Sequence, residues 1–530
     1  MCELRPFQYI SDSSGLIEVT NYAAATTATA TLAGSVNRFV SSTAVMRGDR
    51  GTAVTQEAFT YFVVSGGGST VMPLATRTTY PNTTTSGAQT TTYAYSFTPG
   101  TTQIVSQRTT LPTVTTAQNG PGTAVVVDQV FDAVGREIWS RDGDGFLRYT
   151  EYDAQTGAVV KSIVDVDTSR TADFQNLPTG WLTPTGGGLH LVTTHEVDRL
   201  GRITKATDPN GNVTFTVYDD VNHATRTYVG WNTATLTPTG PIQVSRRDLS
   251  GTYTESLTYS AVPAVDAQGR PTGTEPITNL ESLSRSLVNA AGQVIAVDRY
   301  TNLDGLAYST ATATLGLEGE NYLRTPYAYN NQGQVDRIQN PAGTITISMY
   351  DGLARLTATY VGTDDSTTNG FKWTPSNASA TSKMTQVAAN EYDNGGVGNG
   401  NLTKSTLFPG GSDAPRITEN AYDWRNRLVA TKTGGTGSLT TEDPSVNRPL
   451  TFTDYDNLGR VTGRSVYDGD GIWVIDANAD GVPDKPAAAL LRSSQVSFYD
   501  AQDRVFRTQE LFVNQTTGAL GASRLTTNLF

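Results

Sequence analysis

The residues with the clearest potential for chemistry lie in a short acidic segment near the end of the sequence. Side-chain oxygens stand at positions 1, 3, 5 and 9 of a loop that has glycine at position 6, and these residues are Asp476, Asn478, Asp480, Asp484 and Gly481. Calcium prefers oxygen ligands, and calcium-binding loops supply them at this spacing. Position 12 is Ala487, however, where a calcium loop between two helices carries a bidentate glutamate. Two interpretations remain open: a calcium site, and a polar turn without metal.

No other group of residues has the spacing of a catalytic site. Only three histidines are present, and the five-residue separation of His190 and His195 suits zinc on neither one helix face nor one strand face. The sequence has no nucleophile elbow, phosphate-binding loop, zinc-protease motif or dinucleotide-binding glycine motif. The 50 acidic residues single out no carboxylate pair for glycoside hydrolysis. We therefore expect no enzyme and no cofactor other than calcium, and a glycosidase is the least favoured alternative.

The composition of the chain excludes several kinds of partner. Lys and Arg total 38 and Asp and Glu total 50, which gives a net charge of −12, and no basic segment is interleaved with aromatic residues. Nucleic acid is therefore not an expected partner. No apolar run approaches the roughly 18–20 residues that a membrane span needs. Cys2 is the only cysteine, so internal disulfides are excluded.

From about residue 126 onward one pattern repeats. An aromatic residue or Val, followed by Asp or Asn, returns after 21 residues within the segments 130–153, 196–219 and 328–351. Each segment contains two four-residue turns, ten residues apart, with Asp or Asn first and Gly fourth. This pattern is typical of a type I turn followed by a residue of positive φ, which closes a hairpin. The repeated reversals predict an all-β fold, a continuous antiparallel β-meander.

The turn residues that carry this prediction are Asp132, Gly135, Asp198, Gly201, Asp208, Gly211, Asn330, Gly333, Asp456 and Gly459. In two weaker copies Asn426 and Asp503 replace the glycine, and these residue types tolerate the left-handed region. Ala354 breaks the rule. We therefore expect a different turn there, in which Gly352 takes the positive φ.

Two further residue types accompany the turns. An arginine follows the glycine repeatedly, as in Arg136, Arg202 and Arg460. We expect these arginines to pair with the Tyr-Asp arm across the hairpin or to stack on the tyrosine ring, which would fix register more than stability. The tyrosines before the turns, such as Tyr152 and Tyr218, are expected to stack along the sheet as its main buried surface.

The motif Tyr455-Asp456-Asn-Leu-Gly459-Arg460, together with Asp-Pro-Asn-Gly-Asn at 208–212, resembles the YD repeats of Rhs proteins, bacterial wall-associated proteins, the shell of insecticidal toxin complexes and the teneurins. The resemblance covers roughly 126–507. It implies a β-sheet that spirals into a hollow shell, incomplete here, and in bacterial members a toxic C-terminal domain that a self-cleaving core segment cuts free. Neither segment nor toxin domain is recognisable in this sequence. No autoproteolytic residue can be assigned, and we expect a fragment or a truncated member.

The sequence therefore predicts two regions. Residues 1–125 are rich in Thr, Ala and Gly and form a β region of unknown role, and residues 126–530 form the repeat sheet. The resemblance favours a shell segment of a secreted or cell-surface protein of the polymorphic-toxin kind, which encloses or presents a C-terminal cargo absent from this chain. The alternative is an adhesion module, in which exposed aromatic residues such as Trp231 or Trp424 contact glycans or a cell surface.

Overall fold

The computed structural model describes residues 2–3, 15–365, 381, 383–396, 398–411, 413–435, 442 and 448–528. In these ranges the regular structure is β, apart from three short 3-10 turns at Thr116–Gln118, Asp393–Gly395 and Ala488–Leu490. None of the helical segments described could cross a membrane. The predicted all-β antiparallel meander is confirmed.

The contacts of the chain divide it into two compact units. Unit 1 comprises Met1–Gly145 and Ala388–Phe530, and unit 2 comprises Phe146–Val387. The predicted boundary at residue 125 falls inside unit 1, so the first strands of the repeat region pack with the segment that precedes them. The region of unknown role thus belongs to the same compact body as the last repeats.

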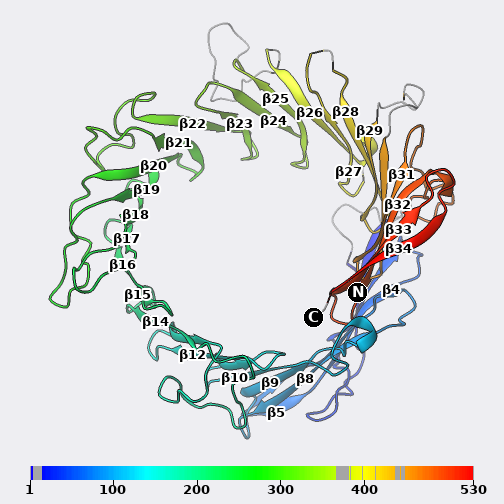
Figure 1. The fold of residues 1–530 in the computed structure, drawn as a ribbon, viewed down its shortest axis with the longest axis horizontal. Coiled ribbons are helices and arrows are strands. Elements are labelled where there is room, and N and C mark those ends of the chain that lie inside the picture. The colour runs from blue at the N-terminus through cyan, green and yellow to red at the C-terminus, as the bar shows by residue number, and fades with distance from the viewer. Residues whose placement is uncertain are drawn as a thin grey trace. The chain divides into compact units, whose positions relative to one another are not determined.

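Unit 2 is one antiparallel meander in which each strand pairs with the next along the sequence (Figure 1). Its strands are β12 (Leu147–Tyr152), β13 (Val159–Val164), β14 (Leu191–Val197), β15 (Ile203–Thr207), β16 (Val213–Asp219), β17 (Ala224–Tyr228), β18 (Ile242–Arg247), β19 (Tyr253–Tyr259), β20 (Leu280–Val288), β21 (Val294–Tyr300), β22 (Tyr322–Tyr329), β23 (Val335–Gln339), β24 (Ile345–Tyr350) and β25 (Leu356–Gly362).

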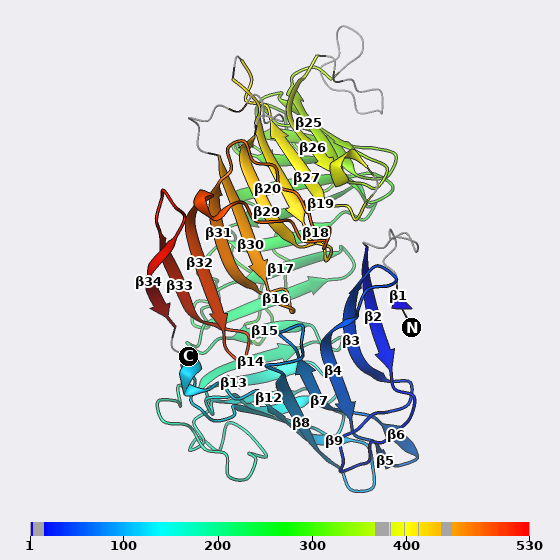
Figure 2. The same cartoon turned by 90° about the vertical axis from the view of Figure 1, so that its right-hand side faces the viewer.

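The first part of unit 1 is also a meander, drawn in blue to cyan in Figure 2. Its strands are β2 (Leu16–Tyr22), β3 (Val40–Arg47), β4 (Val54–Tyr61), β7 (Leu74–Thr79), β8 (Gln89–Phe97), β9 (Ile104–Thr110), β10 (Val126–Phe131) and β11 (Glu137–Arg141). The short strand β1 (Cys2–Glu3) pairs with β2, and β5 (Val64–Gly66) forms a separate hairpin with β6 (Ser69–Val71).

The second part of unit 1 continues the same architecture towards the end of the chain, in yellow to red in Figure 2. Its strands are β26 (Thr385–Tyr392), β27 (Leu402–Leu407), β28 (Arg416–Tyr422), β29 (Leu428–Gly435), β30 (Pro449–Tyr455), β31 (Val461–Asp468), β32 (Leu491–Tyr499), β33 (Val505–Val513) and β34 (Leu520–Thr527).

Many hairpins close in the same local way. The strand register shifts by one residue at the aromatic or Val residue that precedes the Asp or Asn, for example at Tyr350, Tyr455 and Tyr499. Such a β-bulge beside a turn is the expected companion of a type I turn that ends in a residue of positive φ. The local sequence therefore sets both the reversal of the chain and the register of the next strand.

Each unit buries its own apolar cluster. In unit 2 the cluster joins strand residues such as Phe215, Leu257 and Leu283 to Trp231 and Leu315, which lie in long connections between strands. In unit 1 a smaller cluster includes Val429, Leu450, Phe452, Tyr467 and Leu491. Both clusters lie against sheet faces, so the alternation of side chains along each strand decides which residues enter them.

Candidate functional site: the repeat turns and the two sheet faces

The turn at Asp198 shows how the repeat motif works. The backbone N–H groups of Leu200 and Arg202 both donate to Asp198 Oδ1, at 2.9 and 3.0 Å, and the Gly201 N–H donates to the Asp198 carbonyl at 3.0 Å. Gly201 has φ = 79°. The carboxylate therefore accepts hydrogen bonds from the two backbone amides that point into the turn. Glycine adopts the left-handed conformation without steric cost.

The same conformation recurs at the other predicted turns. The fourth residue has positive φ at Gly135, Gly211, Gly333 and Gly459, and at Asn426 and Asp503, where glycine is replaced. Our expectation for Ala354 was wrong: Ala354 itself has φ = 67°, and its N–H donates to the Asp351 carbonyl at 3.0 Å as in the glycine turns. Asp351 Oδ1 accepts from the amides of Leu353 and Arg355, and these bonds hold alanine in a conformation that it rarely adopts.

The arginine after the turn pairs with the aspartate of the incoming arm, which is also the first residue of the turn, so the predicted pair with the Tyr-Asp arm is confirmed. Arg136, Arg202 and Arg460 each bond to the first residue of their own turn, with Nε to Asp Oδ2 distances of 2.6–2.7 Å. The pair forms because Asp and Arg stand on either side of a closed turn. The predicted stacking is present as well: the guanidinium carbons of Arg202 and Arg460 lie 4.2 and 4.6 Å from the ring centres of Tyr218 and Tyr499.

Positions one and five of the turn are chemically matched. Where the first residue is Asn330, the fifth is Gln334, and Asn330 Nδ2 donates to Gln334 Oε1 at 2.9 Å. Where the first is Asp208, the fifth is Asn212, whose Nδ2 donates to Asp208 Oδ2 at 2.7 Å. A carboxylate at position one is thus paired with a hydrogen-bond donor at position five, and an amide is paired with an amide. In both cases a side-chain hydrogen bond closes the turn.

Hydrogen bonds within the turns also fix the ionisation of their carboxylates. For Asp351, the backbone amide of Arg355 is the largest influence on the pKa. Together with the Arg355 guanidinium it outweighs partial desolvation and holds the pKa below the ordinary value of 3.8. For Asp208, the Asn212 side chain and amide lower the pKa in the same direction. These carboxylates are therefore ionised at neutral pH and act as acceptors.

The tyrosines before the turns do not form the main buried surface, contrary to our prediction. Tyr152, Tyr218 and Tyr499 are half-buried, and the fully buried tyrosines are instead Tyr228, Tyr253 and Tyr259. A tyrosine that precedes an Asp turn needs its hydroxyl to reach a partner, and Tyr499 Oη donates to the Val461 carbonyl at 3.0 Å. These rings therefore cover the turn arginines and bridge strands without entering the core.

The acidic segment folds into a compact loop whose oxygens already have partners. Asp476 accepts from the amides of Asp480 and Gly481, at 3.1 and 2.7 Å, and Asp484 Oδ2 accepts from the Ala477 amide at 2.7 Å. Among the described residues no three His, Cys, Asp or Glu side chains group closely enough to hold a metal ion. Calcium binding by Asp476, Asn478, Asp480 and Asp484 stays a prediction.

The histidines have structural partners. The buried His190 accepts from the Asp167 amide through Nδ1 at 3.1 Å, so the proton is assigned to Nε2, which lies 3.2 Å from Asp173 Oδ2. His195 Nδ1 lies 3.2 Å from the Val159 carbonyl. These bonds join both imidazoles to other residues of unit 2.

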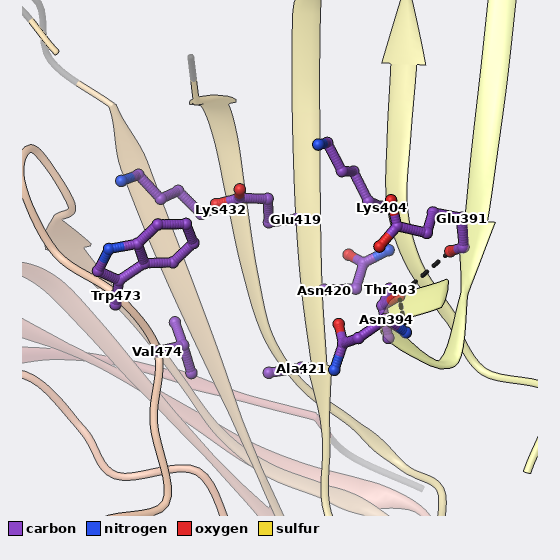
Figure 3. A pocket seen from close by; sticks show the side chains of 10 residues that line it. All are labelled: Glu391, Asn394, Thr403, Lys404, Glu419, Asn420, Ala421, Lys432, Trp473 and Val474. Atoms are coloured by element: carbon purple, nitrogen blue, oxygen red, sulfur yellow. Dashed lines mark hydrogen bonds between the residues drawn. The ribbon is translucent and has the colours of Figure 1, made fainter. Parts of the chain in front are cut away.

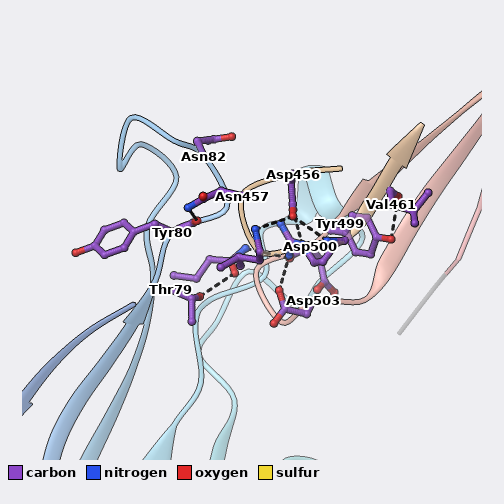
Figure 4. A network of polar contacts seen from close by, with 12 residues as sticks. Thr79, Tyr80, Asn82, Asp456, Asn457, Val461, Tyr499, Asp500 and Asp503 are labelled. Carbon is purple, nitrogen blue, oxygen red and sulfur yellow. Dashed lines mark hydrogen bonds and ion pairs between the residues drawn. The ribbon is translucent and has the colours of Figure 1, made fainter. Parts of the chain in front are cut away.

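Within unit 1, a repeat turn near the C-terminus binds the N-terminal strands (Figure 4). Asn457, the second residue of the Asp456 turn, donates from Nδ2 to the carbonyls of Thr55 and Tyr80, at 2.9 and 2.7 Å. Its backbone N–H donates to the Pro81 carbonyl at 2.9 Å, and its own carbonyl accepts from Gln56 Nε2 at 3.0 Å. Only 3% of Asn457 is exposed, so a residue at a turn tip has become an interior contact.

Other contacts join the same two parts of unit 1. Gln502, in the Asp500 turn, donates to the Pro112 carbonyl at 3.1 Å, and Asn119 donates to the carbonyls of Phe506 and Asn528 at 3.2 and 3.1 Å. Most of these bonds run from a side-chain amide to a backbone carbonyl. Side chains at the variable second and third positions of the repeat turns thus donate hydrogen bonds to backbone carbonyls that lie hundreds of residues away in sequence.

One face of the unit 2 sheet is hydroxyl-rich and uncovered. The strand register from β16 to β21 aligns its side chains in two rows, which we call the open face: Thr216, Thr227, Gln243, Thr258, Ser282 and Thr225, Ser245, Ser256, Ser284, Arg299. All are exposed or half-buried. Neighbouring hydroxyls bond across strands, as Thr258 does with Ser282 at 2.8 Å.

The opposite face of the same strands, which we call the covered face, lies beneath long connections. One of its rows is apolar and contains Val244, Leu257 and Leu283, which are all buried. The connections 229–241 and 301–321 pack Trp231 and Leu315 against it. Glu275, in the connection 260–279, accepts from the hydroxyls of Tyr228 and Tyr259 at 2.5 and 2.7 Å, which fixes that connection to the sheet.

A second row of the covered face is a ladder of alternating charges across β18–β22, namely Arg246, Glu255, Arg285, Asp298 and Arg324. Arg246 and Arg285 donate to the two oxygens of Glu255 at 2.7 and 2.8 Å. The side chains of Glu255 and Arg285 are fully buried. Arg285 also donates to the carbonyls of Ser309 and Thr312, so the ladder holds the connection 301–321 in place.

The aromatic residues that sequence reasoning proposed for glycan contact do not present exposed rings. Trp231 is buried in the unit 2 cluster, which corrects that expectation. Trp424 is half-buried beside Gly481, and its N–H backbone group donates to the Gly481 carbonyl at 2.7 Å. Among the tryptophans that the structure describes, the exposed one is Trp473, with 51% of its surface accessible. It lies in an irregular connection without repeat signal, so only its position beside a Gly-rich turn could have suggested exposure.

Together these features define a meander of turn-bounded strands in which β16–β21 have one covered and one open face. No protein-family model matches the sequence, and no curated protein matches it. Solved structures that it resembles include Tc toxin complexes. They include the crystal structure of TcdB2-TccC3, with TM-score 0.39 and 12% identity over 94% of this chain and 23% of that chain. The structure of TcdB2-TccC3-Cdc42 gives TM-score 0.36 and 11% identity over 94% and 24%.

A Photorhabdus luminescens Tc holotoxin pore with a mutated TccC3 gives TM-score 0.28 and 12% identity over 92% of this chain and 26% of that chain. The chain thus spans about a quarter of the length of these Tc toxin chains.

Proposed function

We propose that this chain is a wall segment of a secreted or cell-surface container of the Rhs or YD-repeat kind, which encloses or presents a C-terminal cargo polypeptide. The observation that carries the proposal is the difference between the two faces of the unit 2 sheet. The covered face buries apolar and charged side chains under long connections, and the open face carries rows of hydroxyls. The YD-type turns and their resemblance to shell-forming repeats support the same assignment.

The open face has the chemistry that a container lining needs. An unfolded or partly folded cargo exposes apolar side chains, and an apolar wall would hold it through hydrophobic contact. Ser, Thr and Gln present little apolar area, and part of their hydrogen-bonding capacity is used across strands, as between Thr258 and Ser282. Because each strand of unit 2 pairs with its sequence neighbours, the wall consists of hydrogen-bonded backbone with few free polar groups.

The experiment uses the natural gene product that contains this segment together with its cargo. The particle is purified and imaged by electron cryomicroscopy, and the cargo is exposed to protease inside the particle and as the isolated polypeptide. We expect density within a cavity and a cargo that survives digestion conditions that destroy it in isolation. A solid particle without a cavity, or a cargo cut at the same rate in both forms, would contradict the proposal.

A paired variant tests the role of the open face in the same particle. Ser256→Leu adds an apolar side chain to the open face, and Ser256→Asn adds a polar side chain of similar size at the same position. If the lining must not bind cargo, the leucine variant slows the release of the cargo and the asparagine variant does not. Equal release from both variants would contradict a lining role for this face.

A further inference from the structure

A small cleft lies in unit 1, between the sheet of β26–β29 and the connection that follows β31 (Figure 3). Its volume is about 250 Å³. Lys404, Glu419 and Asn420 form part of its floor, and Trp473 and Val474 form one wall. The floor belongs to paired strands and the wall to an irregular connection, so the cleft is built where a loop crosses a sheet face.

The floor carries a row of alternating charges that the strand register sets. Glu391 is opposite Lys404, Lys404 is opposite Glu419, and Glu419 is opposite Lys432. Only the last member is fully engaged: Lys432 Nζ donates to both oxygens of Glu442, at 2.8 and 3.0 Å, and to the Ile472 carbonyl at 3.1 Å. Lys432 is buried, and its bonds fix the connection that carries Trp473 against the sheet.

The remaining charged groups of the row are available to a ligand. Within the described part of the chain, the side chains of Glu391, Lys404 and Glu419 make no hydrogen bond or ion pair with each other or with neighbouring residues. Asn420 differs, because its Nδ2 donates to the Leu402 carbonyl at 3.1 Å and its Oδ1 accepts from Thr431 at 3.1 Å. The cleft thus combines a fixed floor with two acceptors and one donor that have no partner among the described residues.

Trp473 completes the site. It is 51% exposed at the edge of the cleft, although burial of such a ring would stabilise the fold. Figure 3 shows the indole beside Lys432 and Glu419, on the side of the cleft opposite Glu391. An exposed ring next to unpartnered polar groups offers a ligand both a stacking surface and hydrogen bonds.

We propose that this cleft binds a saccharide, as a single sugar ring or the end of a glycan chain. A sugar ring has an apolar C–H face that stacks on an indole and hydroxyls that both donate and accept. Its hydroxyls can donate to Glu391 and Glu419 and accept from Lys404. An anionic ligand would face two carboxylates and one ammonium, and an apolar ligand would leave all three charges without a partner. The volume lies at the small end of ligand pockets, which favours one ring over a long oligomer.

The test is a binding titration on the intact 530-residue chain. Glucose, galactose, mannose, N-acetylglucosamine, glucosamine and glucuronate are titrated separately, and binding is followed by saturation-transfer NMR and tryptophan fluorescence. We expect at least one neutral or amino sugar to bind, with affinity in the millimolar range, and glucuronate to bind more weakly because of the carboxylates. Preferred binding of glucuronate, or no binding by any sugar, would overturn the proposal.

Matched variants separate the cleft from the rest of the surface. Trp473→Ala should weaken binding of the preferred sugar by about tenfold or more, since the stacking surface is lost. Tyr22→Ala removes another exposed ring of unit 1 and should leave the affinity unchanged. Glu419→Gln keeps the size of the side chain and should weaken binding of glucosamine more than binding of N-acetylglucosamine. Binding that survives in Trp473→Ala, or falls equally in Tyr22→Ala, would overturn the assignment.

Discussion

The two faces of β18–β20 belong to the same strands yet carry opposite properties. Leu257 is buried under the long connections, and its neighbour Ser256 is exposed among hydroxyls. The period of two in a strand sends adjacent residues to opposite faces, so one short sequence encodes both a core and a polar surface. The difference teaches that the packing which stabilises these strands is on one face. The residues of the other face can therefore vary with little effect on the free energy of unfolding, and they can suit a partner.

The largest effect is expected from the buried charge ladder. Glu255→Ala leaves Arg246 and Arg285 buried without their carboxylate, and breaking a buried pair in this way costs about 3–5 kcal/mol. Thr254→Ala, one residue earlier on the open face, should cost less than about 0.5 kcal/mol. Native-state hydrogen exchange of the β18–β20 amides gives both values. Similar protection of these amides in the two variants would contradict the difference in stability between the two faces.

A smaller effect is expected from the apolar row. Leu257→Ala should lower the local stability of β19 by about 2–4 kcal/mol, because it removes buried methyl groups and leaves a cavity. Ser256→Ala, its neighbour on the open face, should change stability by less than about 0.5 kcal/mol. The same hydrogen-exchange measurement applies. An equal loss in both variants would show that the open face is also packed.

The turns, which belong to neither face, should respond through backbone conformation alone. No atom lies within 4 Å of a Cβ built on Gly459, which has φ = 83°, so Gly459→Val tests strain without crowding and should cost about 1–3 kcal/mol. Ala354→Gly should stabilise its hairpin by about 1 kcal/mol, since alanine already pays for positive φ. Urea midpoints of the two variants that move in the same direction would contradict the shared turn geometry.

The smallest effect is a pH dependence of the turns. The pKa of Asp351 is lower in the folded chain than its ordinary value of 3.8, so the folded state prefers the ionised carboxylate. This contribution to stability is present above the ordinary pKa and is lost as the pH falls through the lowered value. Hydrogen exchange of the Leu353 and Arg355 amides should accelerate, relative to other turn amides, below about pH 4. Asp351→Asn should remove this acid dependence, and an unchanged profile in that variant would contradict it.

Much of the fold follows from local chemistry, which is why it could be predicted. The turn motif, with Asp or Asn first and Gly fourth, depends only on its own four residues. The turns Asp198–Gly201 and Asp456–Gly459 could therefore be recognised without knowledge of their surroundings. The pairing of the turn arginine with the aspartate of the Tyr-Asp arm could be predicted for the same reason. The Asn330–Gln334 and Asp208–Asn212 pairs show that positions one and five vary together, which indicates contact within the turn.

The rest depends on contacts that no local pattern records. Asn457 bonds to Thr55 and Tyr80, which are 402 and 377 residues away in sequence. The choice of covered face depends on the connections 229–241 and 301–321, which have no strand period of their own. Trp473 was missed for the same reason, because its exposure results from the way its connection crosses the sheet, where Lys432 and Glu442 fix it.

Thiol accessibility along β19 tests the two-faced sheet most directly. Cys2 is the only cysteine, so Cys2→Ser provides a background without thiols, into which single cysteines are placed at positions 254, 256, 257 and 259. We predict that cysteines replacing Thr254 and Ser256 react with a maleimide at the rate of an exposed thiol. Those replacing Leu257 and Tyr259 should react at least about tenfold more slowly, limited by local opening. Equal rates at all four positions, or faster reaction at 257 and 259, would contradict the account.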